Sequence, residues 1–219
     1  MAGEKINLDY ITQYLHQVLP PSTGIFRELE EEASADNIPI IHPEVAALLK
    51  VLCKLKKPER ILEVGTAIGY SALCLAGFLP ERGRLITIER DPDMAQRARY
   101  NISRARMEAK IRVIEGEALE VLSCLHSQFD LIFMDAAKGY YLDFFQEVER
   151  LAADGALLIS DNVLYKGMTA TDELVKRRQK TIVGRMREYL TLLCHHKRLT
   201  TSIIPIGDGV ALSYFEEGK

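Results

Sequence analysis

The sequence contains no tryptophan, no CxxC pair and no run of eighteen apolar residues. A transmembrane helix needs about 20 consecutive apolar residues, so none is expected. The N-terminal residues also lack the apolar segment behind basic residues that a secretory signal would show. The cysteines at positions 53, 74, 124 and 194 stand apart in apolar helical surroundings, and no Cys–His cluster suits zinc. We therefore expect a cytoplasmic protein with buried, reduced thiols.

The chain has 219 residues, of which 47% are hydrophobic and 27% charged, which fits one α/β domain. The net charge of −3 hides a basic stretch. Between Lys166 and Arg198 there are nine Lys or Arg residues against three Asp or Glu. Such a stretch can attract a polyanion, although a solvated helix face is the usual explanation.

The hydrophobic pattern divides the domain into a helical layer over residues 1–57 and an α/β core over 58–219. Apolar spacing predicts helices at 7–18, at 23–35 and after Pro43. From residue 60 strands alternate with helices, which predicts a parallel sheet covered on both faces. The strands are expected at 60–64, 84–89, 111–115, 129–134 and 155–160, with helices at 69–79, 92–106, 117–124 and 140–152. A long helix at 172–195 and a hairpin of strands at 200–206 and 210–215 complete the chain.

The turn after the first strand has the pattern Glu63-Val64-Gly65-Thr66-Ala67-Ile68-Gly69. A dinucleotide-binding turn would have G-x-G-x-x-G, whose middle glycine admits a pyrophosphate. That glycine is missing here, which argues against a nicotinamide oxidoreductase. The second strand ends at Glu89, which can accept hydrogen bonds from ribose, and the third is followed by Gly116-Glu117-Ala118. Together these features favour an adenosine ligand without phosphates.

Acidic residues also end the fourth and fifth strands. Asp135 follows one apolar strand, and Asp161 and Asn162 follow the other. An oxygen-only set of this kind suits Mg²⁺, Mn²⁺ or Ca²⁺. Spacing alone is equally compatible with aspartates that cap the segments that follow.

The E-x-G-x-x-x-G turn, the acidic end of strand two and the G-E-A-L run resemble class I S-adenosylmethionine (SAM)-dependent methyltransferases. This resemblance implies a Rossmann-like fold, with a mostly parallel seven-stranded sheet and an antiparallel C-terminal strand. It also implies a set of SAM-binding residues: Ile40, Glu63, Gly65, Gly69, Tyr70, Ser71, Glu89, Gly116, Glu117, Ala118 and Asp135.

The D-A-A-K run after strand four and the D-N pair after strand five resemble the metal-dependent O-methyltransferases, which include the catechol and caffeoyl-CoA enzymes. The resemblance implies that Asp135, Asp161 and Asn162 hold a divalent ion, most simply Mg²⁺. It also implies that Lys138 lies near the acceptor hydroxyl, as a base or as an electrostatic aid.

Three further segments resemble the bacterial branch that methylates 5-hydroxyuridine at the tRNA wobble position, giving 5-methoxyuridine. They are residues 161–167, the basic run 176–180 and the tail 204–213, together with residues 37–41, which in that branch fold over the cofactor. The expected partners are the anticodon stem-loop and, by family resemblance, a second copy of the chain. The basic side chains expected to contact tRNA phosphates are Lys166, Lys176, Arg177, Arg178, Lys180, Arg185 and Arg187.

Two alternatives remain open at this stage. An O-methyltransferase for small catechol-like or phenolic acceptors would share every catalytic residue. The absence of tryptophan, which often walls a catechol pocket, weighs slightly against it. A non-catalytic nucleoside-binding module is disfavoured because the acidic set and Lys138 are both present.

Overall fold

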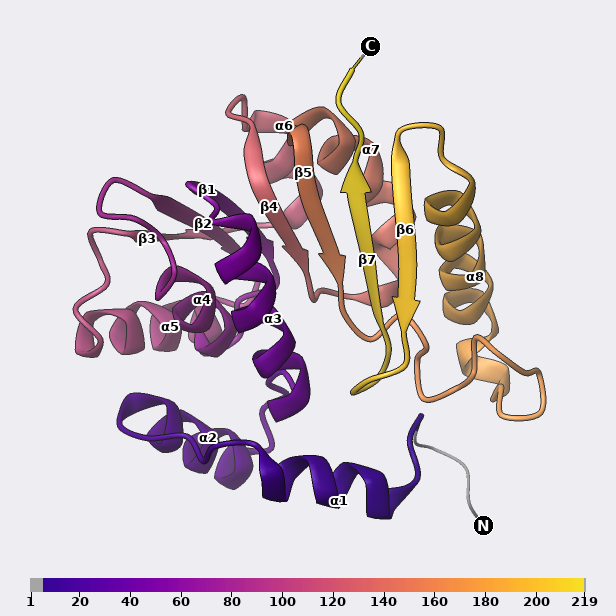
Figure 1. The fold of residues 1–219 in the computed structure, drawn as a ribbon, viewed down its shortest axis with the longest axis horizontal. Coiled ribbons are helices and arrows are strands. Elements are labelled where there is room, and N and C mark those ends of the chain that lie inside the picture. Colours follow the sequence, from indigo (N-terminus) through magenta and orange to yellow (C-terminus); the bar gives the residue numbers. More distant parts are fainter. Residues whose placement is uncertain (1–5, 219) are drawn as a thin grey trace.

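A seven-stranded sheet forms the centre of the computed structural model, which describes residues 6–218 (Figure 1). The strand order is β3-β2-β1-β4-β5-β7-β6, and β7 alone runs opposite to the other six strands. This confirms the predicted fold class. The strands are β1 (Arg60–Val64), β2 (Arg84–Glu89), β3 (Ile111–Glu115), β4 (Phe129–Met134), β5 (Ala152–Ser160), β6 (Leu199–Ile204) and β7 (Val210–Phe215). Within the described residues, no helix has the length and apolar character that a bilayer span requires.

Helices cover the sheet in two layers, each with its own apolar core. The first core joins one sheet face to α3, α4 and α5, and the second joins the other face to α6, α7 and α8. The helices are α1 (Asp9–Val18), α2 (Ile25–Asp36), α3 (Pro43–Lys56), α4 (Tyr70–Ala76), α5 (Pro92–Arg104), α6 (Ala118–Cys124), α7 (Tyr141–Leu151) and α8 (Lys180–His195). Two short 3₁₀ turns, η1 (Lys138–Tyr140) and η2 (Arg177–Gln179), precede α7 and α8.

The predicted helix over 172–195 is wrong in its first third. Helix α8 begins only at Lys180, and the residues before it form turns and η2. The buried positions of α8 are Val183, Met186, Tyr189 and Leu193, which follow helical spacing. Upstream, the apolar residues Leu174 and Val175 are adjacent in sequence and cannot define one helix face. Similarly, β5 starts at Ala152, three residues earlier than expected, directly after α7.

The prediction of buried thiols holds for two cysteines and fails for two. Cys53 and Cys74 are buried in the first core, whereas Cys124 and Cys194 are exposed. Both exposed cysteines lie near the C-terminal end of a helix, on its outer face. Apolar neighbours in the sequence therefore did not show which face of the helix each thiol occupies.

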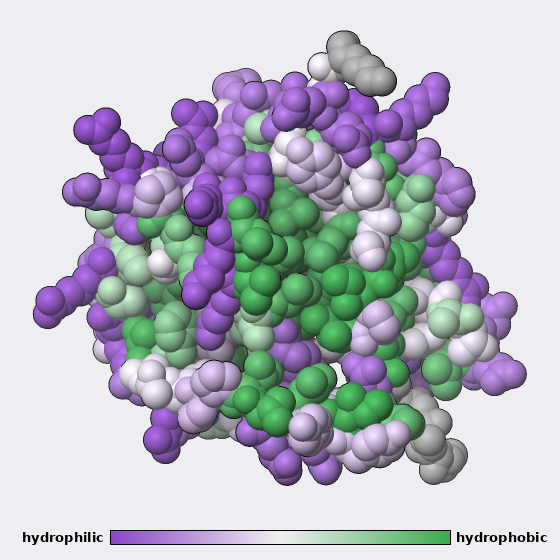
Figure 2. Space-filling model, in the orientation of Figure 1, coloured by the Kyte–Doolittle hydropathy of each residue, from purple (hydrophilic) through white to green (hydrophobic). Residues whose placement is uncertain are grey.

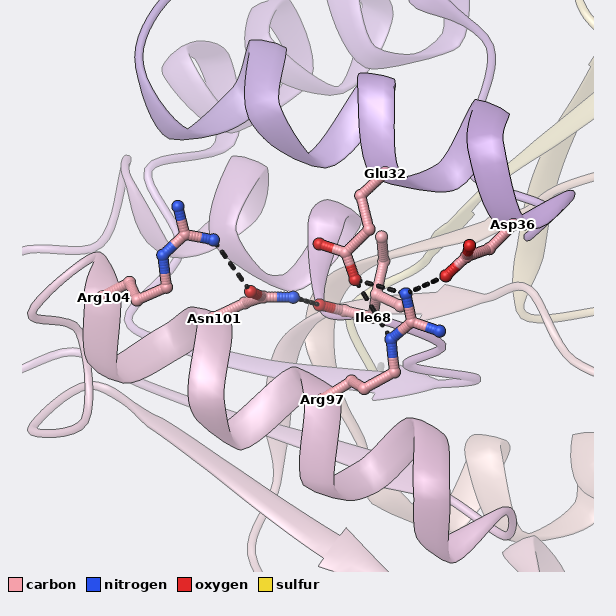
Figure 3. Close-up of polar contacts among 6 residues, drawn as sticks. All are labelled: Glu32, Asp36, Ile68, Arg97, Asn101 and Arg104. Carbon is pink, nitrogen blue, oxygen red and sulfur yellow. Dashed lines mark hydrogen bonds and ion pairs between the residues drawn. The ribbon is translucent and has the colours of Figure 1, made fainter.

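Ion pairs join the N-terminal helix α2 to α5 (Figure 3). The Arg97 guanidinium contacts Glu32 at 2.5 Å and Asp36 at 2.6 Å. One turn further along α5, the buried Asn101 donates its amide to the carbonyl oxygen of Ile68 at 3.1 Å. Helix α5 therefore contacts both α2 and the turn that follows β1. Partly exposed ion pairs each contribute only about 0.2–1 kcal/mol, so these contacts orient α2 more than they stabilise it.

The turn between β1 and α4 depends on two glycines in the left-handed region. Gly65 has φ +100° and Gly69 has φ +87°. A Cβ at Gly65 would lie 2.2 Å from the backbone oxygen of Asp135, which cannot move without breaking β4. A Cβ at Gly69 would meet its nearest atoms at an ordinary 3.5 Å. Both positions require the conformational freedom of glycine, but only Gly65 also requires the space.

We expect Gly65→Ala and Gly69→Ala to differ sharply in stability. The Gly69 variant has backbone strain alone, about 1–2 kcal/mol. The Gly65 variant adds a backbone clash and is expected to lose more than about 4 kcal/mol of unfolding free energy. Urea denaturation of the two variants and the parent chain measures the difference. Equal losses would contradict the packing described for Gly65.

Candidate functional site

A cleft of about 760 Å³ opens at the carboxyl ends of the parallel strands. It lies beside β1 and β4, neighbours from which the chain continues to opposite sides of the sheet. Open α/β sheets bind ligands at such a switch point. Most of the residues expected to bind cofactor or metal line it: Ile40, Gly65, Tyr70, Ser71, Glu89, Gly116, Glu117, Ala118, Asp135, Lys138, Asp161 and Asn162. Glu63 and Gly69 are not among the lining residues.

Glu89 holds the glycine turn as well as lining the cleft. Its Oε2 accepts hydrogen bonds from the backbone N–H groups of Thr66 at 3.2 Å and Ala67 at 2.8 Å. Its Oε1 accepts from the Asp91 N–H at 3.0 Å. A carboxylate has about four acceptor positions, so Glu89 can still accept from ligand hydroxyls. Sequence reasoning predicted Glu89 as a ligand contact but missed its contacts with the turn.

Glu63 lies beneath the turn with its side chain fully buried. Its Oε2 accepts from the Thr87 hydroxyl at 2.6 Å, and the Thr87 hydroxyl also lies 2.5 Å from that of Thr66. Burial raises the pKa of Glu63 to about 8, so the neutral form is favoured below that pH. Glu63 thus supports the floor of the cleft from within the sheet.

The N-terminal layer forms the opposite wall of the cleft. Ile40 and its neighbours in residues 39–42, which follow α2, line it. Tyr70, from the start of α4, donates its hydroxyl to Glu30 of α2 at 2.5 Å and packs edge-on against Phe26 at 5.7 Å between ring centroids. Helix α2 is therefore tied to the cleft wall as well as to α5.

The acidic strand ends meet at the other end of the cleft. Lys138 donates to Asp135 Oδ1 at 2.9 Å, and the two side chains are 20% and 23% exposed. Asp161 is 1% exposed, and its Oδ1 accepts from the Asn162 N–H at 2.7 Å. Its Oδ2 is buried and has no hydrogen-bond partner among residues 6–218. Burial, reinforced by the negative charge of Asp135, raises the pKa of Asp161 to about 7.

The acidic set consists of two carboxylates and one amide. No group of three or more His, Cys, Asp or Glu side chains suited to a metal ion occurs in the described part of the chain. Any ion here would therefore need the Asn162 amide oxygen as a third protein ligand. Asn162 has φ +57°, a left-handed conformation that asparagine tolerates better than most residues.

Two buried tyrosines that the sequence did not reveal hold these strand ends. The Tyr141 hydroxyl lies 3.0 Å from the carbonyl oxygens of both Met134 and Asp161. The Tyr189 hydroxyl lies 2.6 Å from that of Ser160. The rings of Tyr141 and Tyr189 pack edge to face, with 5.3 Å between their centroids. Helices α7 and α8 thereby fix the ends of β4 and β5. The position of Tyr141 soon after D-A-A-K is the only sequence signal that could have identified it.

The basic residues expected to contact tRNA separate into two groups. Lys166, Lys176, Arg177, Arg178 and Lys180 are exposed. By contrast, Arg185 donates to the Gly139 carbonyl and to Asp143, and Arg187 donates to Asp172 and two backbone carbonyls. Both guanidinium groups are therefore already paired within the chain: Arg185 with η1 and α7, and Arg187 with the segment before α8. Their contact with tRNA phosphates stays a prediction.

Comparison with known proteins identifies the family. Residues 22–214 match the O-methyltransferase family. A catechol O-methyltransferase from Niastella koreensis is 39% identical over 58% of this chain and 59% of its own length. A caffeoyl-CoA O-methyltransferase from Populus kitakamiensis is 34% identical over 92% of both chains.

Solved structures agree with the sequence relatives. The O-methyltransferase from Bacillus cereus, in complex with SAH, superposes with a TM-score of 0.84 at 28% identity. The match covers 94% of this chain and 97% of that one. The chain therefore belongs to the O-methyltransferase family, and it is a SAM-dependent O-methyltransferase of the caffeoyl-CoA and catechol type.

Proposed function

We propose that a divalent cation assists the methyl transfer, held by Asp135, Asp161 and Asn162. The unpartnered, buried Oδ2 of Asp161 is the observation that carries this proposal, because a buried carboxylate oxygen needs a cation or a donor. Carboxylate and amide oxygens are the ligands that Mg²⁺ prefers. When bound, such an ion acts as a Lewis acid that lowers the pKa of an acceptor hydroxyl and orients it.

The protein's own residues account for the rest of the reaction. The glycine turn, Glu89 and the Gly116–Ala118 backbone, which line the cleft, would hold SAM and orient its methyl group toward the acceptor. The acceptor hydroxyl would give its proton to water, and its oxygen would then form a bond to that methyl carbon while the carbon–sulfur bond breaks with its electron pair going to sulfur. Lys138, on the cleft wall beside Asp135, lies where it can donate a hydrogen bond to the acceptor oxygen. Much of the rate enhancement then comes from alignment.

Asp161→Asn should separate metal binding from SAM binding. The variant keeps the shape of the side chain but loses a charge at the acidic end, so we expect methyl transfer to fall by a factor of about 100 or more. Calorimetric titration with Mn²⁺ should show a matching loss of affinity, whereas SAH affinity should stay within about twofold of the parent.

Asp154→Asn is the matched control. Asp154 is exposed and lies near the start of β5, the strand that ends just before Asp161. Unchanged Mn²⁺ affinity in the Asp161 variant would contradict the proposed metal set.

We further propose that the acceptor is 5-hydroxyuridine at the tRNA wobble position. Its 5-hydroxyl lies beside the uracil O4, so the two oxygens can chelate an ion as a catechol does. A wobble base in the single-stranded anticodon loop can be splayed into the cleft at modest cost. The end of the cleft that contains Asp135, Asp161 and Asn162 is called the acceptor end. The exposed cations of residues 166–180 begin four residues after Asn162, and they support an anionic partner next to this end. The expected cytoplasmic location is consistent with this substrate and stays a prediction.

A small catechol-like or phenolic acceptor is the second candidate. The names of the Niastella and Populus relatives favour it. The acidic set and Lys138 would serve both acceptors equally, so the residues around the acceptor end must decide between them.

Mass spectrometry of tRNA nucleosides tests the acceptor directly. A strain that lacks this protein should accumulate 5-hydroxyuridine and lose 5-methoxyuridine. Expression of the Asp161→Asn variant in that strain should not restore 5-methoxyuridine. Methylation of catechol by the purified protein, measured in parallel, tests the second candidate. An unchanged nucleoside profile together with catechol turnover would replace the first proposal with the second.

A homodimer is the third part of the proposal. In Figure 1 no helix lies in front of β5, β7 and β6, and Figure 2 shows apolar side chains gathered over this region and α3. Val51 and Leu55 of α3 are 54% and 76% exposed, and Tyr214 of β7 is 40% exposed. Helix α1 likewise buries none of its residues. We infer that a second copy of the chain covers this surface, because large apolar patches on soluble proteins mark interfaces.

Sedimentation velocity of Leu55→Glu tests the interface. A buried charge there should weaken the dimer at least about tenfold, because it loses its water without gaining a partner. Tyr100→Ser, which changes an exposed aromatic residue of α5, should leave association unchanged. A parent chain that sediments as a monomer would rule the dimer out.

A further inference from the structure

A second hollow, of about 320 Å³, is lined by side chains from residues 166–179, which follow Asn162 in the chain. It is formed by the loop after Asn162 and the turn before α8, the segment that was expected to be helical. Lys166, Lys176 and Arg178 line it, together with one carboxylate, that of Glu173, and apolar side chains from residues 168–175. Lys166 is four residues from Asn162, so the two backbones are at most about 14 Å apart.

Two of the cations that line this pocket differ from the paired arginines of the same basic stretch. Neither Lys166 nor Arg178 makes an ion pair within residues 6–218. Arg185 and Arg187, from the same basic stretch, are paired with Asp143 and Asp172. The pocket therefore has two cationic groups that form no ion pair within residues 6–218, against the single carboxylate of Glu173 in its lining, and this excess of positive charge suits an anionic ligand.

The pocket also contains a buried hydrogen-bond acceptor. The Oε1 atom of Gln179 has almost no solvent contact and no hydrogen-bond partner in the described part of the chain. Leaving such an atom unpaired costs about 1–3 kcal/mol. A turn of the Gln179 side chain toward the hollow would let a ligand that carries a donor group, such as a hydroxyl, beside its negative charge satisfy this atom.

The pocket is rigidly attached to the main site. The Lys166 N–H donates to Asp208 Oδ1 at 2.5 Å, and the Val163 N–H donates to the Gly209 carbonyl at 2.9 Å. On the other side of the loop, Arg187 donates to the carbonyls of Thr169 and Met168. Hydrogen bonds thus attach the loop that carries Lys166 both to the segment before β7 and to α8.

We propose that this pocket binds one nucleotide of the acceptor RNA, close to the base that is methylated. Lys166 and Arg178 contact its phosphate, and the Gln179 Oε1 accepts a hydrogen bond from its ribose 2′-hydroxyl. This assignment rests on the proposed tRNA acceptor and narrows it, because it distinguishes a built nucleotide pocket from a diffuse basic surface. It also gives the protein a contact that separates RNA from DNA.

The chain offers matched controls for the test. Arg177 and Lys180 are exposed cations of the same segment that do not line the pocket. Alanine at either position removes the same charge as alanine at Lys166 or Arg178. The probe is a fluorescent anticodon stem-loop RNA that contains 5-hydroxyuridine, with binding measured by anisotropy at several salt concentrations.

We expect Lys166→Ala and Arg178→Ala each to weaken RNA binding about tenfold. Each should also reduce the slope of log affinity against log salt concentration by about one unit. Arg177→Ala and Lys180→Ala should change the affinity less than about twofold. Lys166→Arg should retain binding, which separates loss of charge from misfolding, and SAH affinity should be unchanged in all variants. Equal weakening by pocket and control variants would overturn the pocket and leave a diffuse basic surface.

Gln179→Leu tests the hydroxyl contact. Stem-loops with a single 2′-deoxy substitution at successive positions should show one position at which the parent chain loses affinity. The Gln179 variant should be weaker but insensitive to that substitution. A variant that remains equally sensitive would overturn the contact.

Binding and methylation are measured separately, so the two proposals can fail separately. If the pocket variants lose RNA binding but the parent does not methylate RNA, the RNA-binding pocket is supported and the proposal that tRNA is the methyl acceptor is rejected. If RNA is methylated without any difference between pocket and control variants, the acceptor stands and the pocket falls. If the parent does not bind the stem-loop, both fall.

Discussion

The close packing of Gly65 against the backbone of Asp135 is the constraint on which the rest of the site depends. The two residues follow adjacent parallel strands, β1 and β4, and no side-chain atom fits between them. The methyl-donor end of the cleft and its acidic end therefore touch directly through main chain. Any shift of one strand end would be transmitted to the other, because packed interiors do not deform gradually.

Buried polar groups behind the cleft maintain this arrangement. Glu63 and Thr87 support the glycine turn from below, and Tyr141 and Tyr189 hold the ends of β4 and β5 from the other face. Each of these side chains is fully buried, so each hydrogen bond is made where the protein interior offers few alternatives. The cleft surface thus owes its shape to residues that a ligand does not touch.

The sequence was sufficient to predict the strands and helices whose apolar residues follow a regular spacing. Alternating apolar runs predicted the strands and the helices between them, and residues at the strand ends predicted most of the cleft wall. The sequence was not sufficient where contacts between separate segments determine the partner or the direction of a side chain. Arg185 and Arg187 looked like solvated cations, but the carbonyls and carboxylates that they bind come from other segments. Leu174 and Val175 gave no periodic signal, so the charged run before α8 was wrongly extended as helix. Cys124 and Cys194 show the same limit, because composition does not indicate the direction of a side chain.

The bracing of the loop after Asn162 has a consequence for how such an enzyme can diversify. The loop is attached at a few points, chiefly Asp208 and Arg187, and the strands, the glycine turn and Glu89 take no part in it. The exposed residues of this loop, such as Lys166 and Glu173, can therefore be exchanged or recharged without disturbing the glycine turn and Glu89. The fold in this way separates the glycine turn from the loop after Asn162, so that one can change in sequence while the other keeps its hydrogen bonds.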